Sequence, residues 1–186
     1  MLTKPYCVSL DLEMNQPSGR IIQVGAVVGD LRNAQVLSRF SAFVNPEEPL
    51  APAISDLCGI TPETLEIAGS LSEAYELLTQ WLEPFSEERQ LNPLTWGGGD
   101  SASLRDQLSL HDVSWIFGRR WLDVKTVYIA WQHSRGVIPV GGLAPSMKKV
   151  CLNFKGRKHD AADDALNTFV MYHRLLELMN IGTSPA

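Results

Sequence analysis

Two acidic residues near the amino terminus, Asp11 and Glu13, stand one residue apart in a stretch that is otherwise mostly apolar. If this stretch is a strand, both carboxylates lie on one face with Cβ atoms roughly 7 Å apart, because successive side chains point to opposite sides. Carboxylates this close repel each other, and a hard cation such as Mg²⁺ or Mn²⁺ between them would relieve the repulsion. The alternative is a strand whose polar face meets water, although Asp and Glu are both depleted in strands.

A third acid, Asp100, follows the run Gly97 to Gly99. The run fits neither G-x-G-x-x-G nor G-x-x-x-x-G-K-[ST], so nucleotide binding through either kind of loop is not supported. Asp100 is expected where a strand has ended and a helix begins. It would serve there as a simple N-cap or as a further metal ligand.

Three more aspartates occur near the carboxyl end, in K-H-D-A-A-D-D-A. Asp160 is a good helix N-cap, and Asp163 and Asp164 then fall in the first turn, where acids complement the helix dipole. This position is also expected to keep Asp164 ionised, as a metal ligand must be. Capping explains the aspartates but not His159, whose unperturbed pKa of about 6.5 suits a general base.

The first of these residues belong to a predicted set of three consecutive strands. Clean alternation marks Tyr6 to Met14, while β-branched and aromatic residues are dense in Arg20 to Val28 and in Val36 to Val44. The polar segment 29–35 between the second and third strands predicts an antiparallel meander. The strand that carries Asp11 is expected to be central in the sheet.

The rest of the chain predicts alternating helices and strands. Ser70 and Glu73 form a capping box for a helix that should stop near Pro84. The later elements are expected as a strand at Pro93 to Trp96, a helix from Asp100, a strand at Trp121 to Val124 leading into a helix through about Gln132, and a helix over Ala161 to Met179. Strands first and alternation later predict one α/β domain over residues 1–180, with a mixed sheet flanked by helices and a disordered tail at residues 181–186.

Charge and motifs restrict the class of protein. A formal net charge of -5 argues against a broad basic face for duplex DNA, but less against a nuclease whose bound cations meet the phosphate. A basic cluster precedes His159 and consists of Lys148, Lys149, Lys155, Arg157 and Lys158. It is either a solvated loop or a surface that binds a phosphate backbone. H-E-x-x-H and G-x-S-x-G are absent from the sequence, which leaves zinc peptidase and serine hydrolase chemistry without support.

The cysteines and the hydropathy predict the compartment. The three cysteines lack C-x-x-C spacing, and we expect reduced, buried thiols. No apolar stretch approaches the roughly 20 residues of a membrane helix, and the amino terminus lacks a signal-peptide core. A cytoplasmic protein without a membrane partner is therefore expected.

Taken in order, the motifs resemble the DEDDh branch of the 3′-5′ exonucleases, whose superfamily includes polymerase proofreading subunits and ribonuclease T. The Asp-x-Glu of the first motif is Asp11-Leu12-Glu13, and the second-motif Asp matches Asp100 in T-W-G-G-G-D-S. The third motif, a His followed five positions later by an Asp, matches His159 and Asp164. The stretches L-C-G-I-T-P-E-T-L, W-L-D-V-K and A-D-D-A-L-N-T are most similar to the branch that trims histone mRNA and small RNAs.

The resemblance implies a ribonuclease H-like fold with a five-stranded mixed sheet, and an enzyme that releases nucleoside 5′-monophosphates from 3′ ends. It implies two divalent cations, Mg²⁺ or Mn²⁺, with His159 as general base and with Asp11, Glu13, Asp100 and Asp164 as metal ligands. It also implies a pocket for the terminal nucleotide, and with the basic cluster the candidate substrate-binding residues are Met14, Asn15, Leu57, Ile60 and Lys158. Paired bases would not enter such a pocket, so single-stranded ends are favoured, and the detailed matches favour RNA.

Other functions stay open at this point. A DNA exonuclease or proofreading module would use the same residues. No residue in the sequence indicates a contact with the 2′-hydroxyl group that distinguishes RNA from DNA. A catalytically silent nucleic-acid-binding module is disfavoured by the intact acids and the intact His159. A ribonuclease H-like endonuclease would share the acidic strand but would not require the spacing from His159 to Asp164.

Overall fold

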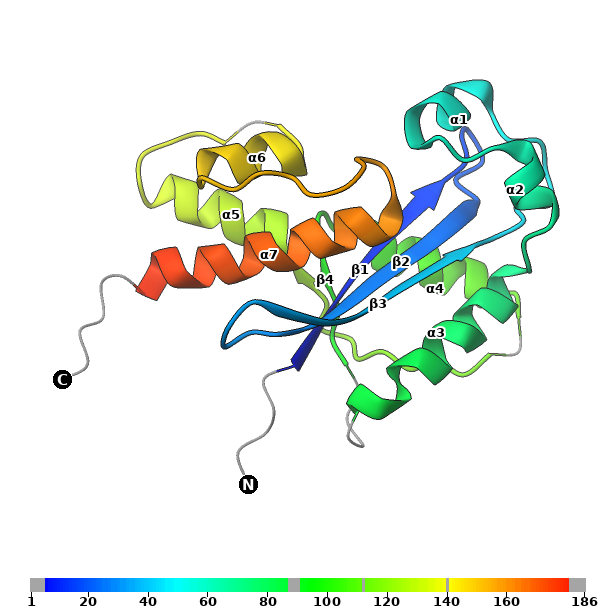
Figure 1. Cartoon of the computed structure of the whole chain (residues 1–186), viewed down its shortest axis with the longest axis horizontal. Helices are drawn as coiled ribbons and strands as arrows, with labels where there is room; N and C mark the ends of the chain where they lie inside the picture. Colours follow the sequence, from blue (N-terminus) through cyan, green and yellow to red (C-terminus); the bar gives the residue numbers. More distant parts are fainter. Residues whose placement is uncertain (1–5, 87–90, 112, 140, 181–186) are drawn as a thin grey trace.

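The computed structural model describes residues 6–86, 91–111, 113–139 and 141–180, so the predicted tail at 181–186 lies outside the described residues. One five-stranded sheet has the order β3-β2-β1-β4-β5 (Figure 1). Its strands are β1 (Tyr6–Met14), β2 (Ile21–Asp30), β3 (Gln35–Phe43), β4 (Leu94–Thr95) and β5 (Leu122–Asp123). The first three strands pair in antiparallel fashion, and β4 runs parallel to both β1 and β5. The predicted meander, the mixed sheet and the central place of β1 are confirmed.

Strand β1 is covered on both faces, which explains why its polar residues need special partners. Its apolar set, Val8, Leu10 and Leu12, belongs to the hydrophobic core on one side of the sheet. Asp11 lies on the opposite face and pairs with Gly25 of β2. The register between β1 and β2 shifts after Glu13, an irregularity of the kind that re-aims side chains beside active sites.

Seven helices occur in the part of the chain that the structure describes. They are α1 (Pro52–Cys58), α2 (Pro62–Glu66), α3 (Leu71–Ser86), α4 (Asp100–Leu108), α5 (Val124–His133), α6 (Leu143–Lys149) and α7 (Ala161–Asn180). The sequence did not predict α1, α2 and α6, because helices of five to seven residues are too short to display an apolar periodicity. Proline at the first turn of α1 and α2 is compatible with their start, since its missing N–H has no partner there in any helix.

Helix α3 confirms the predicted capping box and, to within two residues, the predicted end. Ser70 Oγ accepts a hydrogen bond from the Glu73 backbone N–H, and Glu73 Oε2 accepts one from the Ser70 N–H at 2.7 Å. The helix also ends near Pro84 as predicted, although it continues two residues past the proline to Ser86. Pro84 costs only one backbone hydrogen bond, and it lies within the last turn, so the helix ends soon after it.

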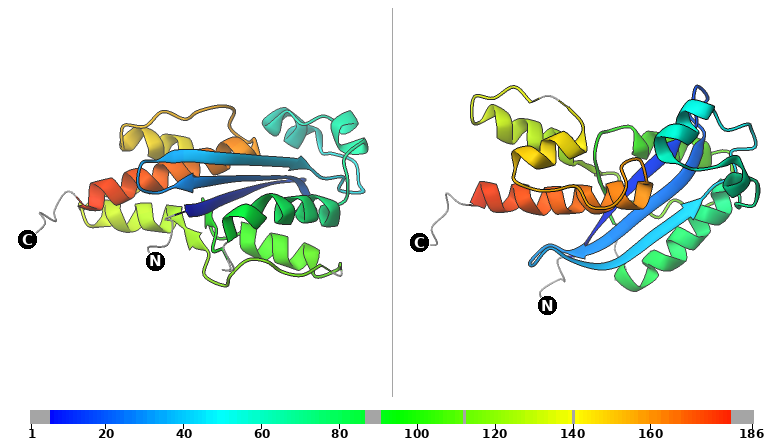
Figure 2. Two further views of the ribbon diagram at one scale, coloured as in Figure 1. Left: turned by 60° about the horizontal axis from the view of Figure 1, so that its bottom comes forward. Right: turned by 45° about the horizontal axis from the view of Figure 1, so that its top comes forward.

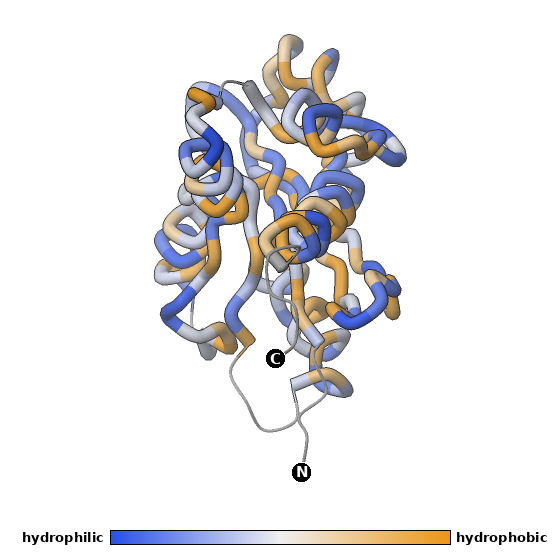
Figure 3. Tube along the Cα trace, turned by 90° about the vertical axis from the view of Figure 1, so that its left-hand side faces the viewer, coloured by the Kyte–Doolittle hydropathy of each residue, from blue (hydrophilic) through white to orange (hydrophobic). Residues whose placement is uncertain are grey.

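The helices form two layers around the sheet (Figure 2). Apolar residues of α3 and α4 pack with the β1 and β2 side chains of one face. Apolar residues of α5, α6 and α7 pack with Val27 and Leu94 on the other face. In Figure 3, where α7 is seen nearly end-on, polar and apolar segments alternate along its turns, as expected for a helix that covers a sheet. No helix among the described residues is long and apolar enough to cross a membrane.

The thiols depart in part from expectation. The structure contains no disulfide among the described cysteines, and Cys58 is buried as predicted. Cys151 is exposed, so the expectation that all three thiols are buried is wrong. Cys151 lies in the turn just after α6 and has a left-handed backbone conformation at φ 61°.

Gly25 allows the amino end of α7 to lie directly on β2. A Cβ added at Gly25 would meet the carbonyl carbon of Ala161 at 2.1 Å, so no side chain fits between strand and helix. Because Gly25 pairs with Asp11, this close approach also brings the first turn of α7 to the acidic face of β1. The glycine thus positions the two chain segments that carry the predicted ligands.

Replacing Gly25 with alanine is expected to lower the free energy of unfolding by about 2–3 kcal/mol, because the added methyl group overpacks a backbone contact that cannot yield locally. Chemical denaturation followed by circular dichroism measures this change. Gly98→Ala is the matched control, since no heavy atom lies within 4 Å of the added Cβ and the two variants differ from wild type by the same group. Equal stability of Gly25→Ala and Gly98→Ala would contradict the packing described for α7.

Candidate active site

Four acidic side chains from three elements influence one another electrostatically at the exposed end of β1. Asp11 and Glu13 come from β1, Asp100 from the first turn of α4, and Asp164 from the first turn of α7. Burial raises the pKa of Asp11 well above its ordinary value, and the charges of Asp100, Asp164 and Glu13 raise it further. Residues 153 positions apart in the sequence, Asp11 and Asp164, therefore belong to one acidic cluster.

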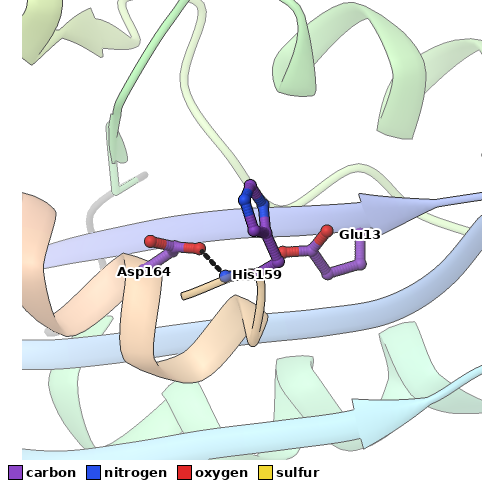
Figure 4. Close-up of side chains that lie close together, drawn as sticks. All are labelled: Glu13, His159 and Asp164. Atoms are coloured by element: carbon purple, nitrogen blue, oxygen red, sulfur yellow. Dashed lines mark hydrogen bonds between the residues drawn. The ribbon is translucent and has the colours of Figure 1, made fainter. Parts of the chain in front are cut away.

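Glu13, His159 and Asp164 form the tightest part of this cluster (Figure 4). One possible ligand atom from each of the three residues lies within 4.8 Å of the others, which is a spacing that a single cation can bridge. The backbone N–H of His159 donates a hydrogen bond of 2.8 Å to Asp164 Oδ2. His159 is exposed, while the two carboxylates are half-buried, so the imidazole lies between the acids and solvent.

The acids are costly to ionise without a cation. Burial is the largest cause in each case, and with the neighbouring acids it raises the pKa of Glu13 to about 8 and that of Asp100 to about 7. The pKa of Asp164 is also raised, because burial outweighs the hydrogen bond from His159. The hydrogen bond and the charge of His159 oppose this shift, so the position beside His159 favours the ionised form of Asp164 while burial disfavours it. Clustered, half-buried carboxylate oxygens are the donor set that hard divalent cations prefer, and the residues fit such ions.

Asp100 is not explained as a helix cap. The N-cap of α4 is Gly99, Asp100 is the first helical residue, and no side-chain capping bond is made there. The preceding glycine run is instead held by Thr95, whose hydroxyl donates to the Gly97 carbonyl, and by Asp123, which accepts the Gly97 N–H at 3.0 Å. The simple N-cap alternative is thus wrong, and the structure places Asp100 in the acidic cluster.

The loop that carries His159 is anchored to the first turn of α7. His159 has a left-handed backbone conformation at φ 60°, which costs a residue with a side chain about 1 kcal/mol and needs support from its surroundings. Asp163 supplies support, because its Oδ2 accepts the Arg157 N–H at 2.7 Å and its Oδ1 accepts from Arg39 of β3. Asn167 adds two hydrogen bonds to the backbone of Lys155.

The start of α7 is fixed to the sheet by Asp160, a predicted cap, and by Gln23, which had no predicted role. Asp160 caps the helix as predicted, accepting from the backbone N–H groups of Ala162 and Asp163. Gln23, fully buried on β2, donates to Asp160 Oδ2 and accepts the Ala161 N–H at 3.1 Å. A buried amide can satisfy both partners at once, whereas an acid at position 23 would face the Asp160 carboxylate.

The residues predicted to line the nucleotide pocket differ in their exposure to solvent. Asn15 is buried, and its amide is occupied by Glu48, the Pro49 carbonyl and the Ala51 N–H, so it fixes the loop before α1. Ile60 is buried in a small core with Ile22 and Cys58. Three predicted residues keep accessible surface, namely Met14, Leu57 and Lys158.

Because Asp163 supports the loop that carries His159, we expect its substitutions to lower stability and activity by different amounts. Asp163→Ala leaves the Arg157 N–H and Arg39 without their acceptor, and we expect it to lower the unfolding free energy by about 1–2 kcal/mol and to lower kcat by loosening the His159 loop. Asp163→Asn keeps a carbonyl oxygen for the Arg157 N–H and should lose less. Thermal unfolding and steady-state kinetics on the same preparations measure both effects. A full loss in Asp163→Asn and wild-type behaviour in Asp163→Ala would each contradict this role.

Residues 8–95 match the sequence profile of the family described as Exonuclease, RNase_T. The chain is 24% identical over 184 residues to "ERI1 exoribonuclease 2" of Danio rerio, in an alignment that covers 88% of this chain and 32% of that protein. The chain thus spans about a third of the length of this curated relative.

Two solved structures show a similar fold. The nuclease domain of 3′hExo, described as a DEDDh family member bound to rAMP, has a TM-score of 0.78 at 20% identity, covering 94% of this chain and 92% of that chain. Pop2p of S. pombe, in an Mg²⁺- and Mn²⁺-bound form, has a TM-score of 0.64 at 16% identity, covering 96% of this chain and 84% of that chain. The ribonuclease H-like architecture predicted from the sequence is confirmed.

Proposed function

We propose that this chain, of which residues 8–95 match the exonuclease family RNase_T, removes nucleotides one at a time from the 3′ end of single-stranded nucleic acid, with RNA favoured over DNA. The observation that carries the proposal is the acidic cluster of Asp11, Glu13, Asp100 and Asp164 with His159 at its exposed side. Residues 1–180 would form the one exonuclease domain. The product would be a nucleoside 5′-monophosphate.

In this proposal the four carboxylates hold two divalent cations, Mg²⁺ or Mn²⁺. When bound, these ions supply charge stabilisation and an activated water for in-line displacement at phosphorus. The raised pKa values of Glu13 and Asp100 support the assignment, since acids that ionise reluctantly on their own gain most from a cation.

His159 would act as the general base. Its exposed imidazole lies next to Glu13 and Asp164, where a water approaching from solvent meets it first. Its backbone is held by Asp164, a proposed ligand, so the ring has a fixed relation to the cation site. General bases placed in this way contribute roughly 10²- to 10⁴-fold to the rate.

The proposal is tested with 5′-labelled single-stranded RNA and DNA of the same sequence, incubated with Mg²⁺, Mn²⁺ or EDTA. A ladder that shortens from the 3′ end is expected, and EDTA, Asp164→Ala and His159→Ala should each abolish it. Faster shortening of RNA than of DNA would support the preference for RNA. Cleavage in EDTA, or internal cuts in a circular strand, would overturn the assignment.

A DNA exonuclease is the second candidate, because the same acids would hydrolyse either backbone. It would be favoured by a faster DNA ladder in the same experiment. A silent binding module would bind both strands and shorten neither.

A further inference from the structure

The guanidinium of Arg157 lies on the backbone of Gly59, in the turn between α1 and α2. A Cβ added at Gly59 would lie 1.8 Å from Arg157 Nη2 and 2.1 Å from Cζ, so the contact needs the absence of a side chain. Gly59 has φ 61°, a left-handed conformation that also favours glycine. The side chain of Arg157 therefore bridges two segments that lie far apart in the sequence, the His159 loop and the α1–α2 turn.

The backbone of Arg157 is held in place by Asp163. Its N–H donates to Asp163, and a Cβ at the preceding Gly156 would meet the same carboxylate at 2.2 Å. Asp163 is paired in turn with Arg39 of the sheet. A long side chain that begins at a braced backbone and rests on Gly59 loses less conformational freedom on binding than a lysine in free solvent.

The guanidinium on Gly59 is not paired with an acid in the described part of the chain. Among the residues that the structure describes, no carboxylate lies within 4.0 Å of its nitrogens, and it makes no side-chain hydrogen bond. Cys58, next to Gly59, is within the electrostatic reach of both Glu13 and Arg157. Arg157 thus presents unused donors at the α1–α2 turn, two residues before His159 in the chain.

We propose that Arg157 binds a backbone phosphate of the nucleic acid strand, the one next to the scissile linkage. The inference rests on the proposed function. The scissile phosphate would be met by the ions that the four carboxylates would hold, so the neighbouring phosphate is the anion left for Arg157. The planar guanidinium can donate two parallel hydrogen bonds to one phosphate, and Gly59 at its back leaves its outer edge accessible.

The test compares wild type, Arg157→Ala and Arg157→Lys on a single-stranded RNA and on the p-nitrophenyl ester of thymidine 5′-monophosphate, which has one phosphodiester and no neighbouring phosphate. In Arg157→Ala we expect the ratio of kcat/KM on RNA to that on the ester to fall about 10-fold, since one charge-assisted contact is lost. The slope of log(kcat/KM) for RNA against log[KCl] should become less steep by about one. Arg157→Lys should restore the salt slope but only part of the ratio.

Arg119→Ala is the matched control, because it removes an exposed arginine that lies before β5, at the opposite end of the parallel strands. It should leave both readouts at the wild-type value. An unchanged salt slope in Arg157→Ala, or equal losses on RNA and on the ester, would overturn the inference while the proposed function stands. A wild-type protein that hydrolyses neither substrate would overturn the proposed function itself.

Discussion

Asp164→Asn is expected to lower kcat at least roughly 10³-fold, beyond the roughly 10- to 100-fold typical of a residue that only supports a metal ligand. At the same time it should raise the unfolding free energy of the metal-free protein at pH 8, because one of the mutually repelling charges is removed. The amide oxygen can still accept the His159 N–H, so the loop keeps its anchor. Opposite signs for activity and stability are the signature of a ligand.

Single-turnover kinetics with saturating Mg²⁺, together with denaturation in EDTA, measure the two effects on one preparation. Asp106→Asn is the control, since Asp106 is an exposed acid on α4 whose loss should change neither quantity. If Asp164→Asn retained wild-type activity, or if it destabilised the metal-free protein, Asp164 would not be a ligand.

The second large effect is a loss of stability with rising pH in the absence of metal. The pKa of Glu13 is raised to about 8 and that of Asp100 to about 7, so the folded state favours their protonated forms. A group whose pKa is raised on folding contributes stability below its unfolded pKa, and this contribution disappears as pH rises through the folded pKa. Allowing for screening at half-buried groups, we expect the unfolding free energy to fall by about 2–3 kcal/mol between pH 4 and pH 8.

Denaturation in EDTA at several pH values measures this decline. Mg²⁺ should restore the stability at pH 8 and have little effect at pH 5, where protons already neutralise the acids. Glu13→Gln should flatten the curve, since the pKa of Glu13 lies further above its ordinary value than that of Asp100. Stability that rises from pH 5 to pH 8 in EDTA would contradict the electrostatics described for the site.

The parts of the fold that were predictable from sequence have strong local signals. Alternation identified β1, and the capping residues Ser70 and Asp160 identified the starts of α3 and α7, because a cap is satisfied within three residues of itself. The end of α3 was predicted to within two residues, since Pro84 falls in the last turn of the helix. Short α1 and α6 carry no such signals, and they form because the surrounding chain packs on them.

The proposed site was predictable to a similar extent and for a similar reason. Asp11 and Glu13 share a face by the geometry of a strand, and the spacing from His159 to Asp164 is local. The contacts of Gln23 with the start of α7 and of Arg157 with Gly59 join residues about 100 or more positions apart, which no local pattern encodes. Asn15 was expected in the pocket, yet its amide is used by the loop before α1.

The distribution of the four acids along the chain has a consequence for biosynthesis. Asp11 and Glu13 lie on β1, the first strand to be synthesised. Asp164 is added 153 residues after Asp11 and joins them only when α7 docks on Gly25. A growing chain on the ribosome therefore lacks a complete cluster until α7 has been made and has emerged. Under the proposed function, the growing chain would thus be inert toward the messenger and ribosomal RNA around it until α7 has docked.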